Sequence, residues 1–127
     1  MIDVKISPGE LIDKITILKL KKQFIKNETQ LKNINIELAL LEPILVNNKL
    51  DSVEIKTLFN KLYEINLKLW KIEDDIRDHE RNSDFGSSFI ELARSVYFTN
   101  DVRADIKKQI NIVAGSNIIE EKSYSKY

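Results

Sequence analysis

Seven apolar residues repeat at alternating steps of three and four between Ile55 and Ile76, a pattern that restricts the fold of this chain strongly. Such an unbroken heptad pattern predicts one helix with an apolar stripe that faces a neighbouring helix. The stripe consists of Ile55, Leu58, Leu62, Ile65, Leu69, Ile72 and Ile76. At about 1.5 Å per residue it extends over roughly 33 Å. A second apolar row on the same helix predicts contact with more than one neighbour, and it contains Phe59, Tyr63, Leu67 and Trp70.

The segment before this stripe also has helical periodicity. Ser7 followed by Pro8 and Glu10 is typical of a helix start, because Ser7 can cap the helix and Glu10 completes a capping box. Apolar residues then recur at helical spacing, with a polar gap at 27–30. We interpret residues 8–46 as one continuous or kinked helix. The alternative is a break at which Asn27 caps a second helix.

A short turn at 47–50 separates this helix from the one that carries the stripe. Asp51 with Glu54 predicts a second capping box, and the helix is expected to continue to about His79. Two long helices joined by a short turn pack antiparallel. We therefore predict a long antiparallel, coiled-coil-like helical hairpin over residues 8–79.

The remainder of the chain predicts two shorter helices, at about 87–98 and 100–114, which pack across the open end of the hairpin. The sequence Thr99-Asn100-Asp101 is interpreted as the break between them, and Gly115 fits the left-handed residue that ends a helix. Residues 115–127 form a tail, in which Ile118 and Ile119 are candidates for docking. The predicted fold is all-α, with residues 1–127 as a single helical domain.

Composition limits the function classes. The chain has 127 residues, no cysteine and equal numbers of basic and acidic residues, so it lacks a disulfide framework and a strong nucleic-acid signal. Residues 1–72 have a net charge of +3, whereas residues 73–127 have −3. The N-terminus shows neither a signal peptide nor a membrane span. We expect a soluble, cytoplasmic protein, without a cofactor or metal.

One candidate binding site lies around the predicted helix start at Asn100. Arg94 and Tyr97 directly precede this position, and Arg103 and Lys107 are four residues apart on one helical face. A helix N-terminus with nearby guanidinium groups favours an anion such as phosphate, carboxylate or a sugar phosphate. The alternative is a corner between two helices that is held by ion pairs.

An acidic segment follows the heptad stripe and contains the other candidate constellation. Glu73 and Arg77 are four residues apart, and several further acids surround His79, the single histidine. Asp74 and Asp78 are also four residues apart, and magnesium is commonly bound by paired carboxylates, so one hypothesis is a magnesium site. The alternative, which we favour, is a solvated helix end whose acids form ion pairs with Arg77 and with the lysines at 21, 22 and 26.

The chain resembles, nearly end to end, an uncharacterised family of small bacterial proteins recorded as a domain of unknown function. The resemblance rests on the segments Gly9–Leu18, Glu37–Leu41, Leu69–Arg77, Glu91–Tyr97 with Thr99–Asp101 and Arg103, and Glu120–Tyr124. It implies no activity, but it implies a setting beside surface-polysaccharide glycosyltransferases. It also joins into one set Glu10, Lys14, Glu73, Arg77, Arg94, Tyr97, Asn100, Asp101, Arg103 and the tail residues Glu121, Lys122 and Tyr124.

We expect a non-enzymatic binding or interaction module that forms a homodimer and has a possible further protein partner. The alternative is a small-molecule-binding protein or enzyme acting on a phosphorylated or carboxylated metabolite such as a sugar phosphate. In that alternative Arg94, Arg103 and Lys107 hold the anion, Tyr97 and Asn100 orient it, and Glu73 or Glu10 is an acid or base. The ligand candidates are Arg94, Tyr97, Asn100, Arg103, Lys107, Glu73, Arg77, Glu10 and Lys14.

Overall fold

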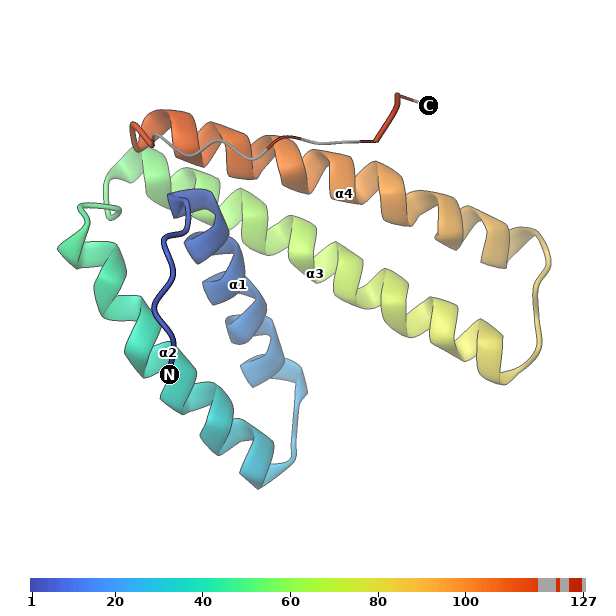
Figure 1. The fold of residues 1–127 in the computed structure, drawn as a ribbon. Helices are drawn as coiled ribbons and strands as arrows, with labels where there is room; N and C mark the ends of the chain where they lie inside the picture. Colours follow the sequence, from blue (N-terminus) through green and yellow to red (C-terminus); the bar gives the residue numbers. More distant parts are fainter. Residues whose placement is uncertain (117–120, 122–123, 127) are drawn as a thin grey trace.

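The computed structural model describes residues 1–116, 121 and 124–126, and these residues form four helices and no strand. The helices are α1 (Pro8–Phe24), α2 (Glu28–Asn47), α3 (Val53–Arg81) and α4 (Ser87–Val113) (Figure 1). The prediction of an all-α chain is thus confirmed for the described residues. The proposed docking of Ile118 and Ile119 lies outside them, as do Glu120, Lys122 and Ser123 of the tail motif.

Side-chain caps explain where α1 and α3 begin. Ser7 Oγ accepts a hydrogen bond from the Glu10 N–H at 3.2 Å, as the sequence predicted. Ser52 Oγ accepts from the Ile55 N–H at 3.1 Å, so Ser52 caps α3 and the prediction of Asp51 as its cap was wrong by one residue. Both caps satisfy backbone donors that have no partner within the helix.

Residues 8–46 form two helices, so the interpretation as one continuous helix was wrong. Ile25 has an extended backbone, with φ of −80° and ψ of 131°, and Asn27 Oδ1 accepts from the Gln30 N–H at 2.9 Å. This cap lets α2 begin in a new direction. As a result α2 folds back on α1 and contributes Ile34 and Leu38 to the core.

The four helices are arranged as two pairs (Figure 1). The long helices α3 and α4 lie side by side and antiparallel, whereas α1 and α2 form a second pair that crosses them near one end. The predicted hairpin between residues 8–46 and 53–79 is not found, because α2 and α3 do not run side by side. The break at residues 25–27 is the reason, since it leaves α4 and α1 as the neighbours of α3.

Helix α4 is continuous, so the prediction of two short helices at 87–98 and 100–114 was wrong. Thr99 is buried, and Asn100 and Asp101 are half-buried within the helix. Helix propensity is a weak determinant, and tertiary packing of such residues overrides it. Gly115 has a φ of 68° directly after the helix end, where the sequence predicted a left-handed residue.

Helix α1 is the centre of the molecule, because it packs against each of the other three helices. Its buried apolar residues are Leu11, Ile12, Ile15, Leu18 and Leu20. They meet the heptad stripe of α3, of which Ile55, Leu58, Leu62 and Ile72 are buried. Among the described residues, no helix combines the length and apolar character needed to cross a membrane.

Candidate functional site

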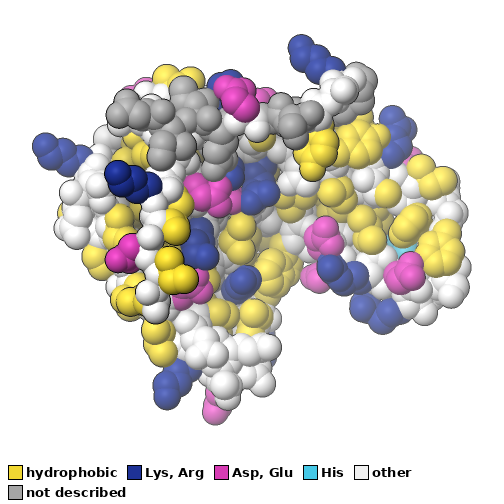
Figure 2. All heavy atoms as spheres, viewed as in Figure 1, with side chains coloured by type: hydrophobic (Ala, Val, Ile, Leu, Met, Phe, Trp, Pro, Cys, Tyr) yellow, Lys and Arg dark blue, Asp and Glu magenta, His cyan; other side chains and the backbone are white. Residues whose placement is uncertain are grey.

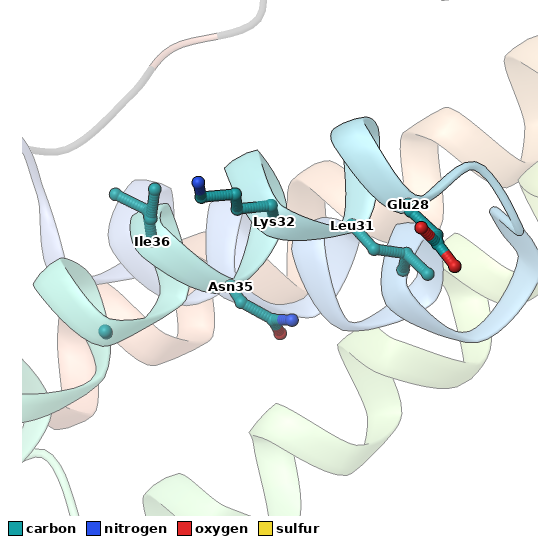
Figure 3. A pocket seen from close by; sticks show the side chains of 6 residues that line it. Glu28, Leu31, Lys32, Asn35 and Ile36 are labelled. Carbon is teal, nitrogen blue, oxygen red and sulfur yellow. The ribbon is translucent and has the colours of Figure 1, made fainter.

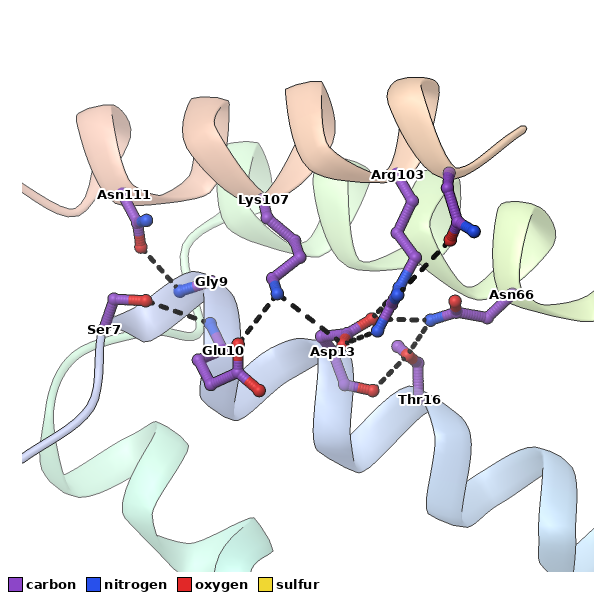
Figure 4. Close-up of polar contacts among 10 residues, drawn as sticks. Ser7, Gly9, Glu10, Asp13, Thr16, Asn66, Arg103, Lys107 and Asn111 are labelled. Atoms are coloured by element: carbon purple, nitrogen blue, oxygen red, sulfur yellow. Dashed lines mark hydrogen bonds and ion pairs between the residues drawn. The ribbon is translucent and has the colours of Figure 1, made fainter. Parts of the chain in front are cut away.

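A buried carboxylate on α1 is the centre of a polar network between three helices (Figure 4). The Asp13 side chain is buried, and its Oδ1 accepts hydrogen bonds from Asn66 Nδ2 of α3 at 2.9 Å and from Arg103 Nε of α4 at 3.0 Å. Arg103 Nη2 donates to Asp13 Oδ2 as well, so the guanidinium holds the carboxylate through two bonds. This geometry is the strong, bidentate form of an ion pair.

Two further buried side chains complete the network on the side of α3. Thr16 Oγ1 donates to the Asp13 backbone carbonyl at 2.7 Å and accepts from Asn66 Nδ2 at 2.8 Å. Asp13, Thr16 and Asn66 were not among the candidate residues. The available signal was their position, because each interrupts an otherwise apolar face of a helix.

Lys107 extends the network along α4, one turn beyond Arg103. Its Nζ donates to Glu10 Oε2 at 2.8 Å and lies 3.9 Å from Asp13 Oδ2. Two cations of α4 thus meet two carboxylates of α1. Three of the candidate residues thus lie in this interface, where Lys107 binds Glu10 and Arg103 binds Asp13.

Gly9 allows α1 to approach α4 closely at the end of this network. The Gly9 N–H donates to Oδ1 of the buried Asn111 at 2.7 Å. A Cβ atom at Gly9 would lie 2.5 Å from the Lys107 carbonyl oxygen, which is too short for a van der Waals contact. The absence of a side chain at Gly9 therefore sets the distance at which Glu10 and Lys107 meet.

Of the remaining candidates on α1 and α4, Asn100 reaches the network through Arg103, whereas Arg94 and Lys14 form contacts elsewhere. Arg94 Nε donates to Tyr97 Oη at 3.3 Å on the exposed side of α4, and Lys14 pairs with Glu37 of α2 at 3.1 Å. Since α4 is continuous, Asn100 does not cap a helix, and the predicted helix start at this residue was wrong. Asn100 Oδ1 instead accepts a long hydrogen bond of 3.5 Å from Arg103.

The acidic segment pairs within its own part of the chain. Glu73 binds Arg77, Asp78 binds Arg81, and His79 Nδ1 lies 3.2 Å from an Asp84 carboxylate oxygen. The expected ion pairs with the lysines at 21, 22 and 26 are not found among the described residues. Among all the residues that the structure describes, no three His, Asp or Glu side chains lie close enough together to hold a metal ion.

Two pockets of about 470 Å³ each share Asn100 and Arg103. The first lies between α1, α3 and α4, where Glu73 and Arg77 also line it together with Trp70. Tyr97 and Lys107 line the second pocket, with Tyr124 of the tail. Glu10, Lys14 and Arg94 line neither. Figure 2 shows side chains of both charges interspersed on the face that carries α1, and a hollow between the α1–α2 pair and the far end of α3 and α4.

A further pocket of about 540 Å³ lies on α2 alone (Figure 3). Its lining includes Glu28, Lys32 and Ile36, and it contains none of the candidate residues. Because one helix supplies the whole lining, this pocket is a shallow surface and brings no distant chemical groups together.

Comparison with known proteins gives one family match. A family model described as "Family of unknown function (DUF6165)" matches residues 2–127. No curated protein and no solved structure matches the chain.

Proposed function

The chain belongs to the DUF6165 family of unknown function, and from the geometry of its own residues we propose that it is a non-enzymatic interaction module that self-associates. One observation carries the proposal. The cations predicted to hold an anion, Arg103 and Lys107, bind the carboxylates of Asp13 and Glu10 across the α1–α4 interface. Polar groups used in this way position helices and leave the outer surfaces for binding.

The energetics of the network support this proposal. An anion that replaced Asp13 on Arg103 would leave a buried carboxylate without its partner. Breaking a buried ion pair costs about 3–5 kcal/mol. A free phosphate or carboxylate would have to offset that cost, so Asp13 already occupies the position that such a ligand would need.

Exposed apolar side chains supply surfaces for a protein partner. Val102 and Ile112 of α4 and Ile36 and Leu40 of α2 are each between 45% and 62% exposed. Exposed apolar residues mark an interaction surface when they form a contiguous patch. The family resemblance implies a setting beside surface-polysaccharide glycosyltransferases. For this reason the proposal includes a further protein partner. The setting suggests no reaction for this chain.

A second candidate function is the binding of a phosphorylated or carboxylated metabolite in the first pocket. It is favoured by one observation, namely that Glu73, Arg77, Asn100 and Arg103 line the same hollow. The two carboxylates of Glu73 and Asp74 oppose the cations there, which weakens the attraction for an anion.

Two measurements on the intact chain test these functions. Sedimentation velocity over a range of concentrations should show a concentration-dependent species with the mass of two chains, and a monomer at every concentration would contradict self-association. Thermal-shift assays with inorganic phosphate, glucose 6-phosphate and citrate test the second function. A ligand at 100 times its Kd stabilises the native state by about 2.7 kcal/mol, so binding would raise Tm clearly.

A further inference from the structure

We propose that a second copy of this chain binds along the groove between α3 and α4, on the side that faces away from α1, about a two-fold axis. This inference rests on the proposed self-association and names its surface.

The groove is continuous along both helices. It contains two consecutive hollows of about 580 and 340 Å³, and Thr57 and Lys61 line both of them. Apolar side chains of α4 form its other wall, namely Val102, Ile106, Ile112 and Val113. Asn66 of α3 contacts α1, and Glu64 lies two residues earlier on the helix, about 200° away, so the groove opens on the opposite side.

The charges along this edge of α3 are complementary to those of the same edge on a second copy that runs in the opposite direction. Glu54, Lys61, Glu64, Lys68 and Lys71 are all exposed and share one face of the helix, because they are spaced by seven, three, four and three residues. A two-fold axis at a level between residues 62 and 63 reverses the direction of the helix. It places Lys61 opposite Glu64 of the second copy and Glu54 opposite Lys71, each pair twice, as a two-fold interface requires.

Neighbouring registers are less favourable. Moving the axis by about one helical turn towards the start of α3 places Glu54 opposite Glu64. Moving it the other way places Lys61 opposite Lys71, which offsets the attraction of Glu64 for Lys68. The register between residues 62 and 63 places Lys68 opposite the uncharged Thr57 and brings no like charges of this face together, so it is favoured, because like charges at an interface oppose binding.

The same axis suits the apolar residues of α4. Lys61 lines the groove with Val102 and Ile106 on one side and with Gln109 and Ile112 on the other. The axis lies slightly further along α3 than Lys61, so it crosses the antiparallel α4 near Asp105. Phe98 and Ile112, which are 40% and 62% exposed, then lie at similar distances on either side of the axis and face each other across the interface. Asp105 then faces Asp105 of the second copy near the axis, and the Lys61–Glu64 and Glu54–Lys71 attractions have to outweigh this like-charge pair.

Charge reversal tests the register. Lys61→Glu and Glu64→Lys each convert two attractions into repulsions, and each should raise the dimer dissociation constant by about tenfold, which corresponds to 1.4 kcal/mol. The double variant Lys61→Glu/Glu64→Lys restores opposite charges and should return the constant to near the wild-type value. Lys32→Glu, on the exposed face of α2, is the matched control and should have no effect. Sedimentation velocity measures all five proteins, with circular dichroism as the test of folding.

Cross-linking provides an independent measurement. Because the chain has no cysteine, Lys61→Cys introduces a single thiol close to the axis, whereas Lys32→Cys introduces one far from it. Oxidation should join two Lys61→Cys chains rapidly and leave the Lys32→Cys chains separate.

The outcomes separate the two proposals. A wild-type dimer that is weakened by both single variants and restored by the double variant supports this interface. A wild-type dimer that none of the variants changes, with equal cross-linking at both positions, overturns the interface while self-association stands. A wild-type monomer at every concentration overturns the proposed self-association, and the interface with it.

Discussion

At the scale of single residues, Asp13 is the group around which the polar side chains between α1, α3 and α4 are arranged. Its carboxylate accepts hydrogen bonds from donors on α3 and α4, although it lies on the innermost helix. A buried charge of this kind is stable only when it is paired and hydrogen-bonded. Arg103 supplies this pairing through two hydrogen bonds to Asp13.

Replacement of Asp13 should destabilise the protein strongly. Asp13→Ala leaves the partly buried Arg103 without its carboxylate, and we expect the free energy of unfolding to fall by about 3–5 kcal/mol. Lys14→Ala is the control on the same helix, because the Lys14–Glu37 pair is exposed and such pairs contribute about 0–1 kcal/mol. Urea denaturation followed by circular dichroism measures both changes. Equal losses for the two variants would contradict a buried, stabilising role for Asp13.

At the scale of the helices, local capping decides where each one starts, and packing decides whether it continues. Asn27 satisfies the first donors of α2 and so permits the break after α1. At 99–101 the sequence looks similar, but Thr99 is buried in α4, and the helix continues through the segment. The difference lies in the tertiary contacts of the residues, because their local preferences are alike.

The start of α3 gives a prediction for one element. Ser52→Ala removes the hydroxyl that accepts from the Ile55 N–H, and it should lower the free energy of unfolding by about 1 kcal/mol. Asp51→Ala should have a smaller effect, since Asp51 precedes the cap. Thermal unfolding of both variants distinguishes the two positions, and a larger loss for Asp51→Ala would restore the capping box first predicted from the sequence.

At the scale of the whole molecule, α1 joins the two helix pairs into one core. It packs on α2, α3 and α4, and the Asp13 network adds polar contacts to its apolar ones. Trp70 of α3 reports on this junction, because its ring stacks on Phe24 of α1 with centroids 5.4 Å apart.

Unfolding should therefore be a single cooperative transition. Because α1 contributes to every helix interface, loss of its packing removes support from all four helices together. Trp70 fluorescence and far-ultraviolet circular dichroism should give the same midpoint and the same slope in urea. If helical signal were lost before the Trp70 signal, one helix pair would unfold by itself and this prediction would be wrong.

The sequence by itself determined the all-α class, the cap at Ser7, the left-handed Gly115 that follows the end of α4, and the burial of much of the α3 stripe. These features depend on neighbours within a few residues, which the sequence displays directly. Arg103, Lys107 and Glu10 were among the candidate residues, but Asp13, the buried carboxylate between them, was not.

Only the tertiary structure decided which helices pair and what the charges do. Apolar periodicity shows that a helix has a buried face, but it does not identify the helix that covers it. The three-residue break at 25–27 turns α2 away from α3, so that α1 and α4 are the neighbours of α3 in place of one long first helix. In the same way, Arg103 and Asp13 are 90 residues apart, and no local pattern shows that a buried carboxylate of α1 neutralises a cation of α4.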